Sequence, residues 1–509
     1  MQAQREVKAM KVLLIKPYLT INSEDCETYG LFPPMGLAYL ASVLERDGFD
    51  VRILDCQITK SGKSNAGLGD SVRMGISDSE IRKYINDFKP SIIGISSNFT
   101  SFYLDPINVA KLSKGACPTA KIVLGGAHAT VAYRDTLNVK EVDIVVKGDG
   151  EMPFLELLQK IREGRHYHDT WNIAAKDETG NIIDNPLREP MTKLDDLPFP
   201  AYHLLDMDRY IHQHGKNFAF YYASPAGFIM TQRGCPYNCI FCSTSKFFKK
   251  YRERSPKNVV DEIEFLVKEY KIREIHILDD CFNANAGRVK EICRGMIDRD
   301  LKISWQVGQG MSITNLDRDS LKLMVESGLY RIGFSIESGS RKTLKYIRKA
   351  MDLERSLQII EQCNSVGLYT HGNFVIGFPY ETVEDVGETV AFIMKSKLDF
   401  IKLTICQPLS GADIYQSFID AGIFDGTPRD GSHYLHTLYD TKFLTASQLN
   451  NIRTGTVRKF FINKILCVFS VNGLRYSIWP KVGSPGKLRY FLKVSFNILR
   501  LIVLRRNIA

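Results

Sequence analysis

The sequence predicts an α/β protein built from two consecutive series of parallel strands. Two observations support this prediction: short apolar runs alternate with helical patterns along most of the 509 residues, and a looser, proline-bearing stretch separates two such series. At about 150 residues per domain, this length predicts two to four domains. The composition, 44% hydrophobic and 24% charged, is typical of a folded soluble protein.

The first series, residues 1–163, predicts a doubly wound domain around a five-stranded parallel sheet. A helical pattern, for example GLAYLASVLERDG, separates neighbouring apolar runs. The predicted strands are Lys11–Pro17, Asp50–Cys56, Ser91–Ser97, Lys121–Gly126 and Asp143–Asp149. Domains of this kind bind ligands beyond the carboxyl ends of their strands.

Polar residues and glycines follow three of these strands. SSNFT follows the third strand, GGAHAT the fourth and KGDGE the fifth. Glycine lets backbone approach a bulky ligand closely, and helix N-termini supply amide donors. Each segment taken singly is also explained by ordinary strand-to-helix turn chemistry. Together they predict a ligand site at this edge of the sheet.

Residues 164–226 predict a connector, and residues 227–430 predict a second alternating series. Six strands are separated by one helical stretch each, or by two between the fourth and fifth strands. They are Gly227–Gly234, Arg273–Asp280, Ile303–Gly310, Arg331–Ser338, His371–Phe378 and Asp399–Gln407. Six units are fewer than the eight of a closed barrel, so we expect an open, partial (β/α)6 barrel with its functional residues at the carboxyl ends of the strands.

The C-terminal region, residues 431–509, predicts a basic, mainly helical segment. From Thr441 onward there are 13 Lys and Arg and no Asp or Glu, so the net charge of +10 belongs to this region. LRYFLKVSFNILRLIVLRR predicts a helix with an apolar and a basic face. Such a helix suits an anionic membrane surface, or it packs on the barrel with solvated basic residues. Nucleic acid is an unlikely partner, because the segment is strongly aliphatic and contains no recognisable RNA module.

The N-terminal sequence predicts neither a signal peptide nor a membrane anchor, because its apolar run is short and no cleavage site follows it. Eleven cysteines without the dense spacing of a disulfide scaffold indicate a reducing compartment. We therefore expect a cytoplasmic protein. If the C-terminal helix contacts lipid, we expect the protein to be bound peripherally at the inner face of the membrane as well.

Three cysteines lie close together in GCPYNCIFCS, directly after the first strand of the second series. They are Cys235, Cys239 and Cys242. Thiolates bind zinc or an iron–sulfur cluster. A structural zinc site needs a fourth protein ligand, which Cys281 or His276 could supply after folding. A four-iron cluster held by three cysteines has one iron without a protein ligand, and that iron can bind a substrate or cofactor.

The segment CPYNCIFC resembles the CxxxCxxC pattern of radical SAM enzymes, and ILDDCF, GFSIESGS and NFVIGFPYET resemble the strand-end motifs of that family. The resemblance implies that the three cysteines hold a four-iron four-sulfur cluster. S-adenosylmethionine (SAM) would bind the open iron, and one-electron reduction would cleave it to a 5′-deoxyadenosyl radical. The residues implied to bind SAM are Phe241, Asp280, Ser335, Glu337 and Gly377. Glu337 could instead be a buried carboxylate paired with a basic residue of the barrel, and Asp280 could cap a helix.

The first domain resembles the cobalamin-binding domain that precedes the radical SAM domain in one subclass of the family. The resemblance lies in PPMGLAYLASVLE, VRILDC, GGAHAT and VVKGDGE. The residues implied to bind cobalamin are Pro34, Met35, Ser97, Asn98, Thr100, Gly125, Gly126, His128, Gly148 and Glu151. A DxHxxG histidine loop is missing, so we expect cobalamin without a histidine on its lower face. His128 is as well explained as a turn residue.

The resemblance implies methyl transfer to an unactivated carbon of a hydrophobic substrate, such as a lipid or isoprenoid, or of a natural product. An external donor of the flavodoxin or ferredoxin type would supply the electron. The alternatives are a ring-forming or oxidative enzyme of the same subclass and a non-catalytic cobalamin- or cluster-binding sensor. Gln309 stands where related proteins often have arginine, which indicates a less anionic substrate. The motifs identify no catalytic residue, substrate carbon or oligomeric state.

Overall fold

The computed structural model describes residues 10–22, 30–58, 64–65, 71–212, 221–248, 250–426, 435–468, 481–482 and 485–504. The chain divides into two compact units. The first consists of Met1–Phe218 with Lys246–Lys249, and the second of Ala219–Ser245 with Lys250–Ala509. Among the helices of the described residues, none has the length and apolar character that crossing a membrane requires.

The first unit is built around a seven-stranded sheet. In sheet order the strands are β10 (Ile182–Asp184), β9 (Ile173–Lys176), β8 (Ile144–Val146), β7 (Lys121–Gly125), β6 (Ile92–Ser96), β1 (Lys11–Lys16) and β3 (Asp50–Asp55). The five predicted strands are present and pair in parallel. The sheet is nevertheless larger than the five strands predicted, because β9 and β10 extend it as an antiparallel hairpin. This hairpin comes from the segment expected to be only a connector.

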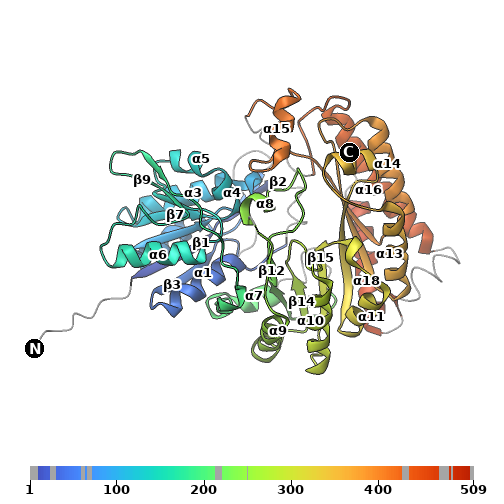
Figure 1. Cartoon of the computed structure of the whole chain (residues 1–509), viewed down its shortest axis with the longest axis horizontal. Coiled ribbons are helices and arrows are strands. Elements are labelled where there is room, and N and C mark those ends of the chain that lie inside the picture. Colours follow the sequence, from blue (N-terminus) through green and yellow to red (C-terminus); the bar gives the residue numbers. More distant parts are fainter. Residues whose placement is uncertain are drawn as a thin grey trace, which may run out of the picture. The chain divides into compact units, whose positions relative to one another are not determined.

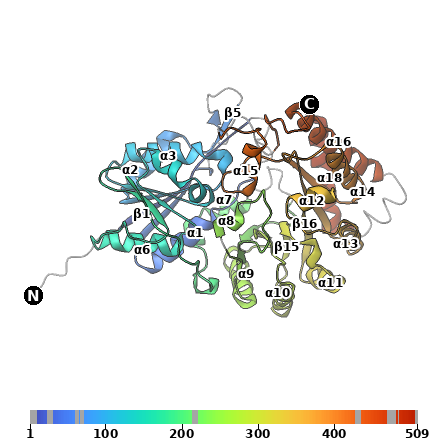
Figure 2. The same cartoon turned by 45° about the horizontal axis from the view of Figure 1, so that its top comes forward.

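Alternate residues of each strand of the first sheet pack against helices on opposite faces. Leu13 and Ile15 belong to one hydrophobic core, and Val12 and Leu14 to the other. Burial on both faces explains why these strands read as continuous apolar runs. Figure 2 shows α2 and α3 on one side of the sheet and α1 and α6 on the other. The helices are α1 (Met35–Arg46), α2 (Asp78–Phe88), α3 (Leu104–Ala116), α4 (Ala127–Val131), α5 (Tyr133–Asn138), α6 (Glu151–Arg162) and α7 (Met207–His212). A small antiparallel sheet of β2 (Leu19–Asn22), β5 (Ser71–Met74) and β4 (Ser64–Asn65) completes the unit.

The second unit contains the predicted open barrel of six parallel strands. In sheet order they are β11 (Ala226–Ile229), β14 (Glu274–Ile277), β15 (Ser304–Met311), β16 (Leu329–Glu337), β17 (Tyr369–Ile376) and β18 (Phe400–Ile405). One predicted strand is divided in two: after Ile229 the chain leaves the barrel, and β12 (Gln232–Arg233) pairs with β13 (Arg252–Glu253). This division places the cysteine segment on a separate loop at the carboxyl end of β11.

Helices cover the outer face of the barrel strands (Figure 1). They are α9 (Pro256–Tyr270), α10 (Ala286–Asp298), α11 (Arg318–Glu326), α12 (Arg341–Tyr346), α13 (Leu353–Ser365), α14 (Val383–Lys395) and α16 (Ala446–Val468); α8 (Thr244–Phe248) and α15 (Asp413–Asp420) lie at the carboxyl-end loops, and α18 (Pro485–Leu504) follows α16. Side chains start several of these helices: Ser255, Asn285, Asp317, Asp352 and Thr382 each accept a hydrogen bond from a backbone N–H in the first turn.

The C-terminal region packs on the amino ends of the barrel strands. Tyr490 and Val494 of α18 are buried with Tyr330, Tyr369 and Phe400. Nearby, the buried Lys481 forms an ion pair with Asp399 at 2.5 Å. Membrane contact and packing on the barrel were the two roles expected for this region, and packing on the barrel accounts for one face of α18.

Candidate functional site

The cysteine loop of the second unit is braced on both sides by backbone hydrogen bonds. The Ile240 N–H donates to the Ile347 carbonyl oxygen at 3.3 Å, and the Ile414 N–H donates to the Ile240 carbonyl oxygen at 2.8 Å. Ile240 lies between Cys239 and Cys242, so the turn after α12 and the start of α15 fix the loop. A metal loop held by its own scaffold keeps its ligands in place before the metal arrives.

The three thiols of this loop lie close enough to influence one another. A hydrogen bond from Cys281 lowers the pKa of Cys235 to about 7, whereas burial raises the pKa of Cys239 to about 11 and also raises that of Cys242. The Thr244 N–H donates to Cys242 Sγ at 3.5 Å. All three cysteines are free of disulfides. They are therefore available as ligands, and Cys281 lies beside Cys235.

The described residues contain no group of three or more His, Cys, Asp or Glu side chains placed to share a single metal ion. His276, considered above as a zinc ligand, instead contacts Glu274 at 2.6 Å and Gln306 at 2.9 Å. In a four-iron cluster each cysteine binds a different iron, so its ligands stand farther apart than those of one ion. His276 is therefore occupied by Glu274 and Gln306, and the three thiols of the loop are a donor set that suits an iron–sulfur cluster.

Glu337 lies near this loop in an unusual backbone conformation. It ends β16 at a register shift relative to β17, and its φ of 72° is in the left-handed region. For a residue other than glycine this conformation costs roughly 1–3 kcal/mol and is concentrated at functional sites. Burial raises the pKa of the Glu337 carboxyl, and Lys349 opposes this rise. The bulge turns a buried carboxylate toward the cysteine loop.

Lys349 is a basic residue that the sequence analysis did not select. Its Nζ lies 3.8 Å from Glu337 Oε1, and both side chains are largely buried. Burial lowers the pKa of Lys349, but Glu337, Cys239 and Cys235 outweigh this effect and raise it. The basic partner considered for Glu337 is therefore present. The local sequence gave no signal for Lys349, since only the turn after α12 brings it to the cysteines.

The other residues implied to bind SAM lie at the same end of the barrel. The Phe241 and Phe378 rings are 6.0 Å apart, Ser335 is on β16, and Asp280 is exposed after β14. Gly377 follows β17 with a φ of 82°, and a Cβ there would meet Ile405 and Leu449 at 3.1 Å. Packing and backbone conformation thus explain this glycine without a ligand. The roles of these residues stay predictions.

Glu381 supports the turn at Gly377 from behind. Its carboxylate accepts hydrogen bonds from the N–H groups of Gly377 at 2.7 Å and Phe378 at 3.3 Å, and burial raises its pKa to about 7. Asp279 has a similar structural role, because it is buried and accepts a hydrogen bond from the Thr231 N–H at 2.6 Å. Both carboxylates thus accept hydrogen bonds from backbone N–H groups of strand ends.

In the first unit, the predicted cobalamin residues gather where the strand order reverses. The chain enters the sheet at β1, adds β3 on one side and then β6, β7 and β8 on the other, so the switch point lies between β1 and β6. Ligands of such sheets bind at this point. Ser97, Asn98 and Thr100 follow β6 directly, and Gly125 ends the adjacent β7.

Gly126 and His128 fit closely against the loop after β6. A Cβ on Gly126 would lie 2.3 Å from Asn98 Oδ1, and the His128 N–H donates to the Ser97 carbonyl oxygen at 3.0 Å. The His128 ring is buried, which lowers its pKa to about 4, and Nδ1 lies 3.1 Å from Thr100 Oγ1. The described structure therefore gives His128 a packing role. Its contact with cobalamin stays a prediction.

The remaining predicted cobalamin residues also lie at the ends of strands or starts of helices in this unit. Pro34 caps α1, of which Met35 is the first residue, Gly148 follows β8 with a φ of 74°, and Glu151 begins α6. Exposed apolar side chains occur at the same edge, and sequence analysis missed them: Phe32, Phe99, Tyr103 and Leu104 are 37–63% exposed. An apolar surface at the switch point fits a large planar group such as a corrin.

Comparison with known proteins assigns each unit a family. Residues 27–158 match the B12 binding domain, and residues 229–393 match the radical SAM superfamily. The chain is 34% identical over 415 residues to the uncharacterized methyltransferase PH0819 of Pyrococcus horikoshii, covering 81% of this chain and 83% of the relative. It is 31% identical to cytidylyl-2-hydroxyethylphosphonate methyltransferase of Streptomyces wedmorensis, covering 82% of this chain and 83% of the relative.

A solved structure shares the fold of most of the chain. OxsB, a cobalamin-dependent SAM radical enzyme solved with aqua-cobalamin and SAM, superposes with a TM-score of 0.68 at 17% identity, covering 98% of this chain and 72% of OxsB. The two family models confirm that a cobalamin-binding domain precedes a radical SAM domain and, with them, the expected cofactors, and the shared fold confirms the α/β class.

Proposed function

The chain belongs to the cobalamin-dependent radical SAM enzymes, and from this membership we propose that it transfers a methyl group to an unactivated carbon of its substrate. The observation that carries the proposal is the group formed by the cysteine loop, Glu337 and Lys349 at the carboxyl end of the barrel. A B12-binding unit in the same chain supplies a second cofactor site. The names of both relatives, which are methyltransferases, support methyl transfer over ring formation or sensing.

The residues of the chain hold and orient the cofactors in this proposal. When bound, the cluster and SAM supply a 5′-deoxyadenosyl radical, and cobalamin supplies the methyl group. Cys235, Cys239 and Cys242 would hold three irons, and the Glu337 carboxylate would accept hydrogen bonds from SAM. Lys349 balances the negative charge that the thiolates and Glu337 bring into a buried site. An external donor of the flavodoxin or ferredoxin type would deliver the electron.

The test is a product analysis of the fully loaded protein. The chain is reconstituted without oxygen with iron, sulfide and cobalamin, and it receives SAM with a trideuterated methyl group and a one-electron reductant. We expect 5′-deoxyadenosine together with a labelled product that is heavier by a trideuteromethyl group in place of hydrogen. Candidate substrates are cytidylyl-2-hydroxyethylphosphonate and cell extracts separated into polar and lipid fractions. Loaded protein that forms no 5′-deoxyadenosine with any of them contradicts the proposal.

We further propose that the outer face of α18 contacts an anionic membrane surface, so that a lipid or other hydrophobic molecule is a candidate substrate. Leu488, Leu492 and Phe496 are 44%, 59% and 70% exposed and recur every four residues along one face of α18. The opposite face carries the buried Tyr490 and Val494. The region from Thr441 to the end has no acidic residue, so its charge complements anionic lipid.

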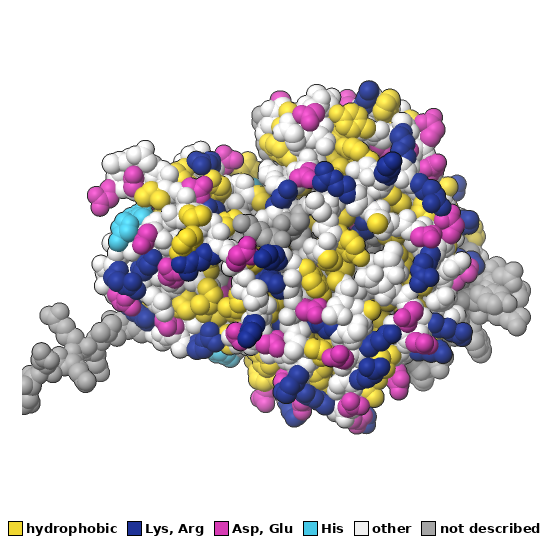
Figure 3. All heavy atoms as spheres, in the orientation of Figure 1, with side chains coloured by type: hydrophobic (Ala, Val, Ile, Leu, Met, Phe, Trp, Pro, Cys, Tyr) yellow, Lys and Arg dark blue, Asp and Glu magenta, His cyan; other side chains and the backbone are white. Residues whose placement is uncertain are grey.

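A full-length double variant tests membrane contact without removing the packed face of α18. Leu492→Ser with Phe496→Ser should reduce co-sedimentation with vesicles containing phosphatidylglycerol, and 1 M salt should weaken binding of the unchanged protein. Leu438→Ser, at an exposed leucine outside α18, serves as the control. Equal sedimentation of the double variant and the control would rule out this surface. Basic and acidic side chains are mixed on the face of the molecule seen in Figure 3, so general charge attraction is a weak alternative there.

A further inference from the structure

Three strands of the barrel place a row of polar side chains on one face. The register pairs Ser335 of β16 with Asn373 of β17, and Asn373 with Lys402 of β18. His371 lies two residues before Asn373 and is paired with Gly333 and Phe400. Side chains at paired positions of neighbouring parallel strands point to the same side of a sheet, so these groups share one surface.

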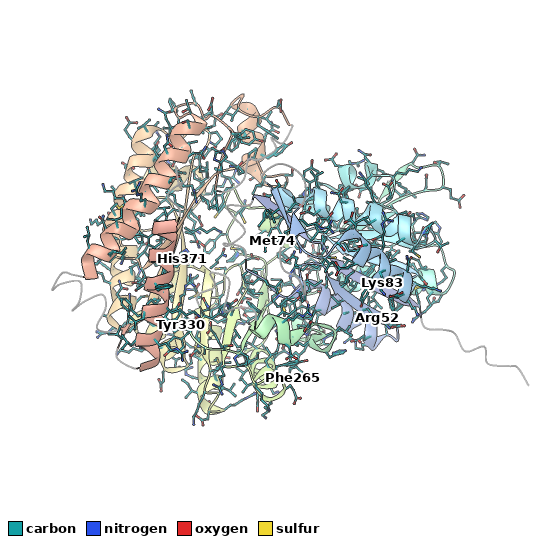
Figure 4. The ribbon with its side chains drawn as sticks, turned by 180° about the vertical axis from the view of Figure 1, so that it is seen from behind. Arg52, Met74, Lys83, Phe265, Tyr330 and His371 are labelled. Carbon is teal, nitrogen blue, oxygen red and sulfur yellow. The ribbon has the colours of Figure 1, made fainter. Side chains whose placement is uncertain are left out.

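This row lies on the inner face of the barrel. The intervening residues, which point the other way, are fully buried and apolar: Phe334, Ile336, Phe374, Ile376, Leu403 and Ile405. Helix α14 covers that outer side, where the Phe374 ring lies 6.2 Å from the Phe392 ring of α14. Figure 4 labels His371 and Tyr330 on the barrel strands. The polar row therefore faces the interior that the six strands enclose.

Lys402 is exposed to solvent although it lies in the middle of a strand whose outer face is covered. Its pKa is lowered because protein surrounds it, and it has no hydrogen-bond or ion-pair partner among the described residues. A side chain that solvent reaches and that protein nevertheless surrounds is expected to face a recess, and Lys402 has both properties. Gln309 of β15 and Leu278, directly after β14, are also exposed, so the open interior reaches several strands.

Two neutral groups beside Lys402 have unused hydrogen-bonding atoms. Asn373 Oδ1 and His371 Nε2 are buried and have no partner among the residues that the structure describes. Arg331 donates to His371 Nδ1 at 3.0 Å, so Nδ1 accepts and the proton of the neutral imidazole is on Nε2. Burial also lowers the pKa of His371 well below its usual value, which agrees with the neutral ring. Native structures rarely leave such atoms unpaired without a ligand or water to bind them.

The acidic residues of the barrel interior do not neutralise this side. Glu274 of β14 accepts hydrogen bonds from Tyr330 at 2.5 Å and from Gln306 at 3.1 Å, and it also contacts His276. Glu337 pairs with Lys349. The buried Arg331 adds positive charge below His371. Lys402, Arg331 and the neutral donors thus make the side of β16–β18 electropositive.

The amino end of the barrel is closed on this side. Tyr330, Tyr369 and Phe400 lie within the first two residues of β16, β17 and β18, and they pack with Tyr490 and Val494 of α18 into a buried cluster. A ligand of Lys402 would therefore enter from the carboxyl end, where the cysteine loop lies.

We propose that the inner face of β17 and β18 binds an anionic oxygen group of the substrate, a phosphate, phosphonate or carboxylate, through Lys402 with His371 and Asn373 as neutral partners. Charge-assisted hydrogen bonds from lysine suit such groups, and the neutral donors fix their orientation. This inference rests on the proposed function, because it assigns a substrate class to the same barrel. It reverses the expectation drawn from Gln309: the arginine absent from β15 is replaced by a lysine on β18.

The experiment measures binding and requires no turnover. Phosphorus NMR line widths follow titration of inorganic phosphate and methylphosphonate into the cobalamin- and cluster-loaded full chain, and saturation-transfer proton NMR follows acetate. Lys402→Met should weaken binding of the preferred anion at least tenfold, whereas Lys402→Arg should retain most of it. Lys395→Met, at an exposed lysine on the outer helix α14, should bind like the unchanged protein. The ranking of the three probes identifies the anion class.

Two results would overturn the inference. One is unchanged anion affinity in Lys402→Met, or no anion binding by the unchanged protein. The other is an equal loss of affinity for SAM in Lys402→Met, which would assign the lysine to the cofactor site. Failure of the proposed function looks different: anion binding that depends on Lys402 would persist in a protein that forms no methylated product.

Discussion

The charged side chains toward the two ends of the barrel differ in whether other protein groups pair with them. At the amino end, Glu274 receives hydrogen bonds from Tyr330, Gln306 and the Ala223 N–H, and Asp399 pairs with Lys481. Farther along β17 and β18, in the interior that opens toward the carboxyl end, Lys402 has no partner among the described residues, and His371 and Asn373 each keep an unpaired atom. Every buried polar group has a desolvation cost, which a complete network offsets and an incomplete one does not.

The difference distinguishes stability from binding. At the closed end the carboxylates of Glu274 and Asp399 are paired with protein donors, although the buried Tyr369 hydroxyl has no partner among the described residues. Unsatisfied groups at the open end reduce stability until a ligand supplies their partners. The strained Glu337 belongs to the same open end, which places strain and incomplete bonding together. Variants at the two ends should therefore separate loss of folding from loss of binding.

The largest effect is expected from the cysteine loop at the open end. Replacing Cys235, Cys239 and Cys242 by alanine should remove the iron–sulfur chromophore completely, because no other thiol can replace three ligands. Cobalamin binding should persist, since its site is in the other unit. Visible absorption and iron content measure the loss of the cluster. The cobalamin spectrum after gel filtration measures how much cobalamin stays bound. A variant that keeps its cluster would show that the ligands are elsewhere.

The next effect concerns the closed end. Lys481→Met should lower the free energy of unfolding by about 3–5 kcal/mol, because it leaves the Asp399 carboxylate buried without its cation. Denaturant titration measures the loss. Burial raises the pKa of Asp399 but Lys481 holds it below the usual value, so this stability is present above about pH 4 and is lost as the pH falls further. Lys459→Met, at an exposed lysine of α16, is the control, and an equal loss there would contradict a specific role for Lys481.

A pH-dependent effect is expected at Glu381, which supports the Gly377 turn. Burial raises its folded pKa from 4.5 to about 7, so the folded protein retains a proton that the unfolded chain releases. Stability should therefore fall as the pH rises from about 4.5 to about 7. Glu381→Gln should flatten this part of the profile, because a neutral amide still accepts the hydrogen bonds of the turn. Melting temperatures at several pH values test this, and an unchanged slope would mean that Glu381 is ionised.

Tyr330→Phe should cost about 1 kcal/mol of stability, because Glu274 loses one of its hydrogen-bond donors but keeps the others. SAM and anion binding should not change, since this residue belongs to the closed end. Urea titration and equilibrium binding provide the two measurements. If Tyr330→Phe binds SAM or the anion more weakly and keeps its stability, then the amino end of the barrel also contributes to binding, contrary to this prediction.

The smallest effect on stability is expected from Asn373→Ala. Removing a side chain whose Oδ1 is already unpaired should change the free energy of unfolding by less than about 0.5 kcal/mol. Affinity for the anion preferred by the protein should nevertheless fall several-fold. A stability loss as large as that of Tyr330→Phe would show that Asn373 has a partner in the folded protein.

Local pattern was sufficient for the parts of the fold that follow from periodicity. Continuous apolar runs predicted the five parallel strands of the first sheet and the six barrel strands, because burial on one or both faces must be present in the sequence itself. The hairpin Ile173–Asp184 was missed, since its two strands are short and resemble a connector until they meet the sheet edge. Edge strands depend on a neighbour that the sequence does not show.

The sequence by itself determined the family and its cofactors, because three cysteines at fixed spacing and a succession of strand-end motifs are local features. Only the tertiary structure brought Lys349 to Glu337, and only it aligned Lys402 with Asn373 and Ser335. It also closed the amino end of the barrel with the C-terminal helix. These contacts join chain segments that are far apart in sequence. They depend on strand register and on packing, which no stretch of neighbouring residues shows.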